Sequence, residues 1–140
     1  MIILDTNVLS ALMTTVPDGR IVAWLDQQAP ESVWTTAVTV FEVRLGLELL
    51  VPGRRKVRFE QAFSNALVED LDGRVLPFDE AAAEAAAVIA ARRQRRGVPI
   101  DLRDTQIAGI ATVRRGAIAT RNVRHFSGLD VEVVNPWRTH

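Results

Sequence analysis

The chain has 140 residues, which is enough to bury a substantial core, and we predict one domain over residues 1–140. Its 17 Lys and Arg balance 17 Asp and Glu, so the formal net charge is zero and any nucleic-acid-binding surface must be a local patch. The sequence contains no cysteine, which excludes disulfides, thiolate zinc sites and cysteine nucleophiles and fits a reducing cytoplasm.

The first half of the chain alternates short apolar segments with helical patterns. In order, we predict a strand at Ile2–Leu4, helices at Val8–Met13 and Asp18–Gln28, a strand at Val33–Thr36, and helices from Thr39 to about Leu50 and from Arg54 to Leu71. The first of these segments is apolar at every position, which is typical of a strand buried on both faces of a parallel sheet.

The second half continues this alternation. In order, we predict a strand at Arg74–Pro77, an alanine-rich helix at Asp79–Arg96, a helix at Asp104–Arg115, and strands at Ala117–Ala119 and Val131–Val134. Strands separated by helices form parallel sheets through right-handed crossovers, with helices on both faces. We therefore predict an α/β fold of three layers, α/β/α, around a central parallel sheet of about five strands.

Two of these helices carry apolar residues at helical spacing, which predicts their buried faces. In the helix after the second strand these residues are Val38, Phe41, Leu45 and Leu49. In the next helix they are Val57, Phe63, Leu67 and Leu71. Three further apolar residues of these helices do not belong to either series and form either a partner interface or part of the core. They are Leu47, Leu50 and Phe59.

No segment of the sequence predicts export or membrane insertion. The N-terminus, Met1–Asp5, lacks the basic region and the long apolar run of a signal peptide. The most apolar stretch, Ala81–Ala91, is too short and too interrupted to span a bilayer. We therefore expect a cytoplasmic protein that does not cross a membrane.

Three acidic residues lie where functional groups gather in parallel sheets. Asp5 follows the first strand, Glu42 lies in the first turn of the helix after the second strand, and Asp104 opens the helix before the fourth strand. Each also has a structural explanation, because Asp5 can cap a helix, Glu42 can complete a Thr39-x-x-Glu42 capping box, and Asp104 suits a helix N-terminus. Asp101 can cap the same helix as Asp104.

The apolar pattern around these acids favours a shared site. Asp104 shares a helix face with apolar residues, Glu42 lies at the edge of an apolar stripe, and Asp5 ends a buried strand. Three carboxylates in one crevice repel each other unless a cation neutralises them. Oxygen donors without cysteine favour a hard cation, so we predict Mg²⁺ or Mn²⁺ as the cofactor.

Four segments of the chain resemble the motifs of PIN-domain nucleases, in the order in which that family carries them. These segments are Ile2–Asn7, Val40–Gly46, Asp104–Ala108 and Thr120–Phe126. Together they are similar to the VapC-type toxin ribonucleases of bacterial toxin–antitoxin pairs, including the FitB-like branch. Because the motifs extend over nearly the whole chain, we expect a single PIN domain.

This resemblance implies a metal-dependent endoribonuclease in which Asp5, Glu42 and Asp104 bind the metal and carry out catalysis. It implies RNA as the substrate, with transfer RNA as the expectation at the level of the family. It also implies a homodimer and a VapB-type antitoxin as partners. The metal would activate water and offset charge on the scissile phosphate.

Several polar residues near the acids are candidates for supporting roles. Thr6 and Thr120 can hydrogen-bond the acids or the phosphate, and Asn7 can fix the neighbouring turn. Asn122 falls where many relatives carry a fourth acid, and His125 stands where relatives with a Thr-Arg-Asn motif often have aspartate. These two departures weaken the expectation of a fully charged site for a second metal.

The arginines fall into groups with different interpretations. Arg121 and Arg124 lie near the predicted site and are candidates for binding the phosphates of the substrate. A second group, at the end of the alanine-rich helix, is interpreted as a solvated face with favourable helix-end charges. This group comprises Arg92, Arg93, Arg95 and Arg96.

Two alternatives to a ribonuclease remain open at this point. The first is a degenerate PIN-like module that binds RNA or a partner without cleavage, which Asn122 and His125 favour. The second is a phosphotransfer domain with Asp5 as nucleophile. The second is weaker, because its usual pattern has another aspartate two residues later and this chain has Asn7 there.

Overall fold

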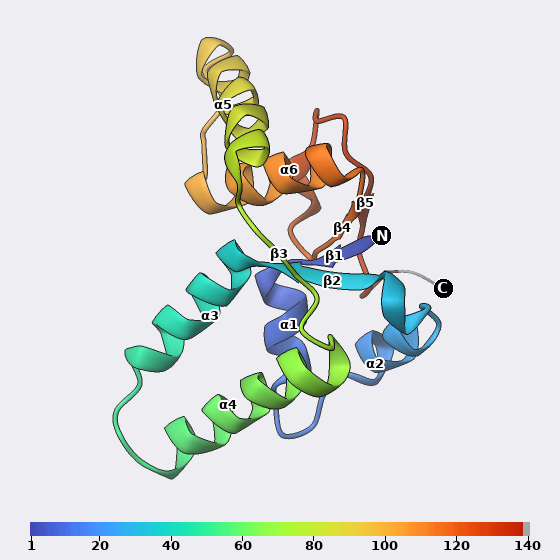
Figure 1. The fold of residues 1–140 in the computed structure, drawn as a ribbon, viewed down its shortest axis with the longest axis vertical. Helices are drawn as coiled ribbons and strands as arrows, with labels where there is room; N and C mark the ends of the chain where they lie inside the picture. Colours follow the sequence, from blue (N-terminus) through green and yellow to red (C-terminus); the bar gives the residue numbers. More distant parts are fainter. Residues whose placement is uncertain (139–140) are drawn as a thin grey trace.

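A computed structural model describes residues 1–138 of the chain and has at its centre a parallel β-sheet (Figure 1). Within these residues the sheet has five strands in the order β3-β2-β1-β4-β5, and every neighbouring pair is parallel. The strands are β1 (Ile2–Leu4), β2 (Val33–Thr36), β3 (Val75–Leu76), β4 (Ala117–Ala119) and β5 (Val133–Val134). The predicted α/β class and the parallel sheet of about five strands are confirmed.

Helices cover both faces of this sheet. They are α1 (Thr6–Leu12), α2 (Gly19–Asp26), α3 (Ala37–Glu48), α4 (Arg54–Asn65), α5 (Glu80–Arg95) and α6 (Leu102–Arg114). In Figure 1, α5 and α6 lie above the strands, whereas α1, α2 and α4 lie below them. Successive side chains of β1 point to opposite faces of the sheet. Ile3 packs in the core beside α5 and α6, and Leu4 packs in the core beside α1 and α4. The predicted three layers are therefore present.

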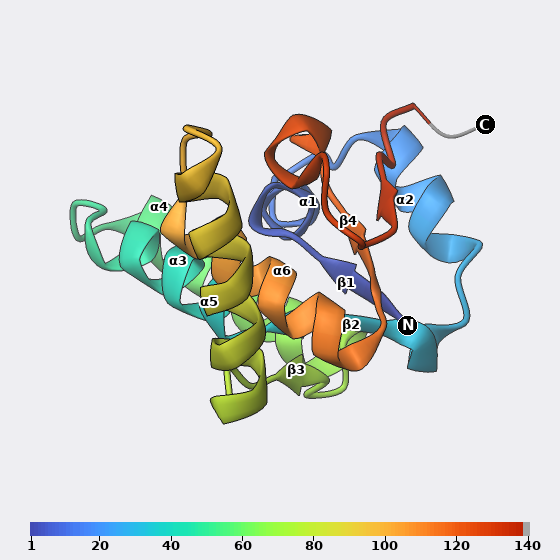
Figure 2. The same cartoon turned by 90° about the horizontal axis from the view of Figure 1, so that it is seen from above.

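The strand order creates a switch point beside the first strand. From β1 the chain proceeds outward through β2 to β3, and then returns to the other side of β1 with β4 and β5. Figure 2 shows β1 in the middle of the sheet, between β2 and β4. In open parallel sheets, the crevice at the carboxyl ends of the strands on either side of such a switch is the usual ligand site. Asp5, directly after β1, lies at this point.

The exposed face of α3 differs from the prediction. Phe41 and Leu49 are 57% and 77% exposed, whereas Val43 and Leu47 are buried in the core. The prediction is confirmed at Val38, which is buried, and wrong at Phe41 and Leu49, because α3 is apolar on nearly every side and helical spacing alone does not identify its buried stripe. Leu47 therefore belongs to the core.

The helix after α3 also combines confirmed and corrected positions. The segment predicted over 54–71 consists of α4 followed by one π-helical turn at Ala66–Asp70. Phe63 and Leu71 are buried as predicted, but Val57 is 64% exposed and faces solvent. Together with Phe41 and Leu49, Val57 gives α3 and α4 an apolar outer surface.

The position of α6 depends on its close contact with the alanine-rich α5. A Cβ atom at Gly109 of α6 would lie 2.5 Å from the carbonyl oxygen of Ala82 and 2.8 Å from the Cβ of Ala86. Glycine at this position and alanine on α5 therefore allow the two helix backbones to approach closely. This contact fixes the helix whose first turn carries Asp104.

None of the helices within residues 1–138 combines the length and the apolar character that crossing a lipid bilayer requires.

Candidate active site

A cavity of about 650 Å³ opens at the switch point of the sheet. The three predicted acids line it although they come from distant parts of the sequence: Asp5 after β1, Glu42 on α3 and Asp104 on α6. Thr6, Asn7 and Asn122 line the same cavity. We refer to it below as the acidic pocket.

Asp5 is held by hydrogen bonds at both carboxylate oxygens. Its Oδ1 accepts from the backbone N–H of Thr6 at 2.8 Å, which makes Asp5 the N-cap of α1. Its Oδ2 accepts from Thr120 Oγ1 at 2.8 Å and from Asn7 Nδ2 at 3.1 Å. Asp5 is only 3% exposed, and no ion pair is made to it within the described residues. The cap explains α1 starting at Thr6 rather than Val8.

Asn7 and Thr120 connect the ends of β1 and β4. Asn7 Nδ2 also donates to Thr120 Oγ1 at 3.2 Å, and Asn7 Oδ1 accepts from the backbone N–H of Arg121 at 2.9 Å. The backbone N–H of Asn122 donates to Thr120 Oγ1 at 3.0 Å. The structure thus places Asn7 and Thr120 next to Asp5, where the sequence predicts supporting residues, and their functional role stays a prediction.

Glu42 has a different place in its helix from the one predicted. The N-cap of α3 is Thr36, whose Oγ1 accepts from the backbone N–H of Thr39 at 3.1 Å. Glu42 therefore lies in the second turn, and the capping box with Thr39 was a wrong prediction. The signal that misled us is the run Thr35-Thr36, whose second threonine caps the helix three residues earlier. Helix capping does not explain the carboxylate of Glu42.

The carboxylate of Asp104 is likewise free of a capping role. The N-cap of α6 is Asp101, whose Oδ1 accepts from the backbone N–H of Asp104 at 2.9 Å. This confirms the alternative that Asp101 caps the helix. Asp104 is directed instead to the pocket, where its Oδ2 lies 2.7 Å from Nδ1 of His125.

Two acids of the pocket, Glu42 and Asp104, have a raised pKa. Burial is the largest cause of the raised pKa of Glu42, and the negative charges of Asp5 and Asp104 add to it, whereas Thr6 and Arg103 lower it. Burial also raises the pKa of Asp104, with further contributions from Asp101 and Asp5, and the contact with His125 lowers it. Crowded carboxylates of this kind are typical of sites that bind a cation or a proton.

Two contacts from within the chain partly compensate these charges. Arg103 Nη1 lies 3.7 Å from Glu42 Oε2, and its guanidinium lies over the ring of Phe41 at 5.5 Å from the centroid. His125 contacts Asp104 as described above. Sequence reasoning missed both pairs, because neither spacing along the chain nor residue type indicates them. Among residues 1–138, no three acidic or histidine side chains are already arranged to hold a metal ion.

The arginines proposed to bind substrate lie beside the acidic pocket rather than in it. Arg121 and Arg124 line a neighbouring cavity of about 230 Å³ that shares Asn122 and His125 with the acidic pocket. The guanidinium of Arg121 lies over the ring of Trp137, at 4.0 Å from its centroid.

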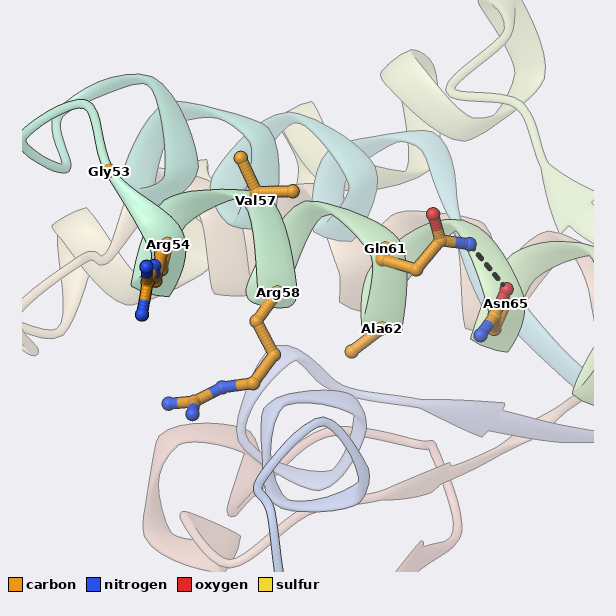
Figure 3. A pocket seen from close by; sticks show the side chains of 7 residues that line it. All are labelled: Gly53, Arg54, Val57, Arg58, Gln61, Ala62 and Asn65. Carbon is orange, nitrogen blue, oxygen red and sulfur yellow. Dashed lines mark hydrogen bonds between the residues drawn. The ribbon is translucent and has the colours of Figure 1, made fainter.

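A third hollow lies along α4, away from the acids. Figure 3 shows it beside the helix, with Val57, Arg58 and Ala62 among its side chains and a 2.9 Å hydrogen bond from Gln61 to Asn65. Its volume is about 840 Å³, and no acidic residue lines it. Val57 lines it together with polar and charged residues of the same helix, namely Arg54, Arg58, Gln61 and Asn65.

The fold and the pocket together define a PIN domain. The acids after β1, on α3 and on α6 meet at the carboxyl edge of the parallel sheet, as the sequence motifs imply. The family model of the PIN domain matches residues 2–131, and the chain belongs to this family.

The relatives that the chain resembles include a toxin, a VapC ribonuclease and a plasmid stability protein. The chain is 39% identical over 137 residues to toxin FitB of Neisseria gonorrhoeae. This alignment covers 98% of this chain and 99% of FitB. It is 36% identical over 137 residues to a VapC ribonuclease of Sinorhizobium fredii, covering 98% of each chain. A crystal structure of FitAcB from Neisseria gonorrhoeae superposes with a TM-score of 0.89 at 39% identity, covering 99% of this chain and 100% of that one. The resemblance to VapC-type and FitB-like toxins is therefore confirmed.

Proposed function

We propose that this protein is a cytoplasmic, metal-dependent endoribonuclease that acts as the toxin of a VapBC-type toxin–antitoxin pair. The observation that carries the proposal is the meeting of Asp5, Glu42 and Asp104 in one pocket, where helix capping accounts for neither Glu42 nor Asp104. The names of the relatives, a VapC ribonuclease and a FitB toxin, support it. RNA, including transfer RNA, is the proposed substrate.

The donor set of the pocket fits a hard divalent cation. It consists of carboxylate oxygens, and Asp5 contributes to the raised pKa of both Glu42 and Asp104. Mg²⁺ or Mn²⁺ would remove this repulsion, and we propose Asp5, Glu42 and Asp104 as its ligands. When bound, the ion would supply activation of water and would offset negative charge on the scissile phosphate.

The residues of the chain have separate tasks in the proposed hydrolysis. Asp5 is fixed in position by its three hydrogen bonds, so it offers a rigid carboxylate edge to the pocket. Glu42 has a raised pKa, which suits a group that takes up the proton of the attacking water. The water oxygen adds to phosphorus, the phosphorus–oxygen bond to the leaving nucleoside breaks, and the proton given up by the water ends on the leaving oxygen.

A binding module without cleavage is the second candidate. The contacts of Glu42 with Arg103 and of Asp104 with His125 favour it, because they already partly compensate two of the three acids. Phosphotransfer through Asp5 is disfavoured, since both oxygens of Asp5 accept hydrogen bonds and Asn7 occupies the position of the second aspartate. Incubating the purified protein with structured RNAs, with and without Mg²⁺ or Mn²⁺, separates cleavage from binding alone.

Metal binding has a consequence for stability that can be measured without RNA. The pKa of Glu42 and Asp104 is raised in the folded state, so their contribution to stability is present below their unfolded pKa and is lost as pH rises through the folded pKa. Mn²⁺ is expected to restore stability at pH 7.5, by about 2.7 kcal/mol at 100 times its Kd, and to have less effect at low pH, where protons compete with the ion for Glu42 and Asp104. Thermal unfolding by calorimetry measures both.

A matched pair of variants assigns this effect to the pocket. Glu42→Gln is expected to weaken the stabilisation by Mn²⁺, whereas Glu48→Gln, an exposed position on the same helix, is expected to retain it. A protein whose Tm at pH 7.5 does not respond to millimolar Mn²⁺ would argue against a metal site.

We propose an antitoxin of the VapB type as the partner. The solved structures similar to this chain include one of FitAB bound to a DNA fragment, at a TM-score of 0.89 and 38% identity. The apolar outer surface of α3 and α4, with Phe41, Leu49 and Val57, is the surface on this chain that we propose it covers.

A homodimer is the proposed state of the chain by itself. Light scattering of the purified chain is expected to give twice the mass of 15.5 kDa. A monomer mass at micromolar concentration would contradict this.

A further inference from the structure

The smaller cavity next to the acidic pocket has the opposite electrostatic character. Its lining includes Arg121, Arg124 and Arg138, together with Asn122 and His125, through which it adjoins the acidic pocket. Among the described residues no carboxylate lines it. We propose that the three arginines form a phosphate-binding subsite, which holds a phosphodiester of the RNA strand next to the one that is cut. This inference rests on the proposed function of the acidic pocket.

The charges of these three arginines are available to a ligand. In the part of the chain that the structure describes, none of the three makes an ion pair with a carboxylate. Arg121 contributes weakly to the lowered pKa of Asp18, whose main partner is Arg20. In a chain with a formal net charge of zero, three such guanidiniums at one cavity are the local basic patch that binding to nucleic acid requires.

Arg121 is held in place from two sides. Its guanidinium lies over the ring of Trp137, at 4.0 Å from the centroid, and stacking of this kind leaves the in-plane N–H groups free to donate. Trp137 is fixed in turn, since its backbone N–H donates to Asn135 Oδ1 at 3.0 Å. The backbone N–H of Arg121 donates to Asn7, which also bonds Asp5. The basic subsite and the acidic pocket are therefore parts of one hydrogen-bonded framework.

The chemistry of the subsite favours a phosphate group. Guanidinium forks form paired, charge-assisted hydrogen bonds to phosphate oxygens, and several of them around one cavity suit a group with several anionic oxygens. A strand whose scissile phosphate enters the acidic pocket carries its next phosphate to an adjoining position. The basic cavity shares Asn122 and His125 with that pocket, so it is placed to receive this second phosphate.

The test measures binding of RNA in the absence of cleavage. Fluorescence anisotropy of a labelled single-stranded RNA is recorded in EDTA at several salt concentrations, for the unmodified protein and for the Arg121→Gln/Arg124→Gln/Arg138→Gln variant. The variant is expected to bind on the order of tenfold more weakly or worse near 0.1 M salt. The slope of log K against log salt is expected to fall by about 0.7, since the subsite neutralises one phosphate of the single strand.

A second triple variant provides the matched control. Arg92→Gln/Arg95→Gln/Arg96→Gln removes the same number of charges from the end of α5, away from both cavities. It is expected to keep the affinity within about twofold and the salt slope unchanged. Circular dichroism establishes that both variants are folded, and the single variant Arg138→Gln, at an exposed position, extends the test if the first triple variant is unstable.

The outcomes separate this inference from the proposed function. Equal RNA binding by the two triple variants overturns the subsite, even if RNA is cleaved in Mn²⁺. A specific loss in the first variant supports the subsite, even if no metal gives cleavage, which would contradict the proposed function instead. The same loss with a DNA strand assigns the contact to the phosphate and supports the inference. If the first variant loses affinity for poly-glutamate but keeps its affinity for RNA and DNA, the phosphate subsite is overturned in favour of an acidic protein partner.

Discussion

Asp5→Asn is expected to lower metal-dependent RNA cleavage by about three orders of magnitude or more. The substitution removes the negative charge that the proposed ion needs. It also introduces an amide NH₂ among groups that all donate, namely Thr6 N–H, Asn7 Nδ2 and Thr120 Oγ1. The amide NH₂ cannot accept the hydrogen bonds that the replaced carboxylate oxygen of Asp5 accepts, so the groups around it are no longer held in place. Single-turnover cleavage of a structured RNA in Mn²⁺ measures the effect.

The matched control for this experiment is Asp79→Asn. Asp79 caps α5 as Asp5 caps α1, with its Oδ1 accepting from the backbone N–H of Ala82 at 3.0 Å, but it does not line the acidic pocket. Asparagine is nearly as good an N-cap as aspartate, so this variant is expected to cleave within about twofold of the unmodified protein. If Asp5→Asn behaved like Asp79→Asn, Asp5 would be a helix cap and nothing more.

Phe63→Ala is expected to lower the free energy of unfolding by about 3–5 kcal/mol. Phe63 is 0% exposed, and its ring fills the core between α4 and the sheet, with Val43 and Leu47 of α3 in the same cluster. Arg44 covers the ring at 5.4 Å from its centroid. Removing the ring leaves a cavity that the surrounding helices cannot fill, and urea unfolding measures the loss.

Val57→Ala on the same helix tests the corrected orientation of α4. Val57 is 64% exposed, so its truncation is expected to change the free energy of unfolding by no more than about 0.5 kcal/mol. The sequence pattern alone had grouped Val57 with Phe63 on one buried face. Similar losses in the two variants would favour that original prediction over the structure.

The order of elements along this chain was accessible from the sequence for a simple physical reason. Strands such as Ile2–Leu4 and Val33–Thr36 are short, uniformly apolar or β-branched, and flanked by capping residues, so their ends are marked locally. Once the strands alternate with helices, the parallel sheet and the location of a site at its carboxyl edge follow from general rules. Asp5 could be placed there because it directly follows β1.

The details of the site depend on contacts that leave no local signal. The face of α3 is decided by what packs against it, because the helix is apolar on nearly every side. Arg103 reaches Glu42 from another helix, and His125 reaches Asp104 across 21 residues. The sequence predicts that Asn122 and His125 change the position where relatives carry a fourth acid. In the structure, the His125 ring contacts Asp104, one of the three acids, directly.

The hydrogen bond between Thr120 and Asp5 joins residues 115 positions apart. It forms only when β4 has taken its place beside β1, which is one of the last steps available to a chain emerging from the ribosome. A nascent or truncated chain that ends before β4 lacks both this bond and the neighbouring strand that supports the pocket. We therefore expect a chain that ends before β4 to lack the activity of the complete pocket.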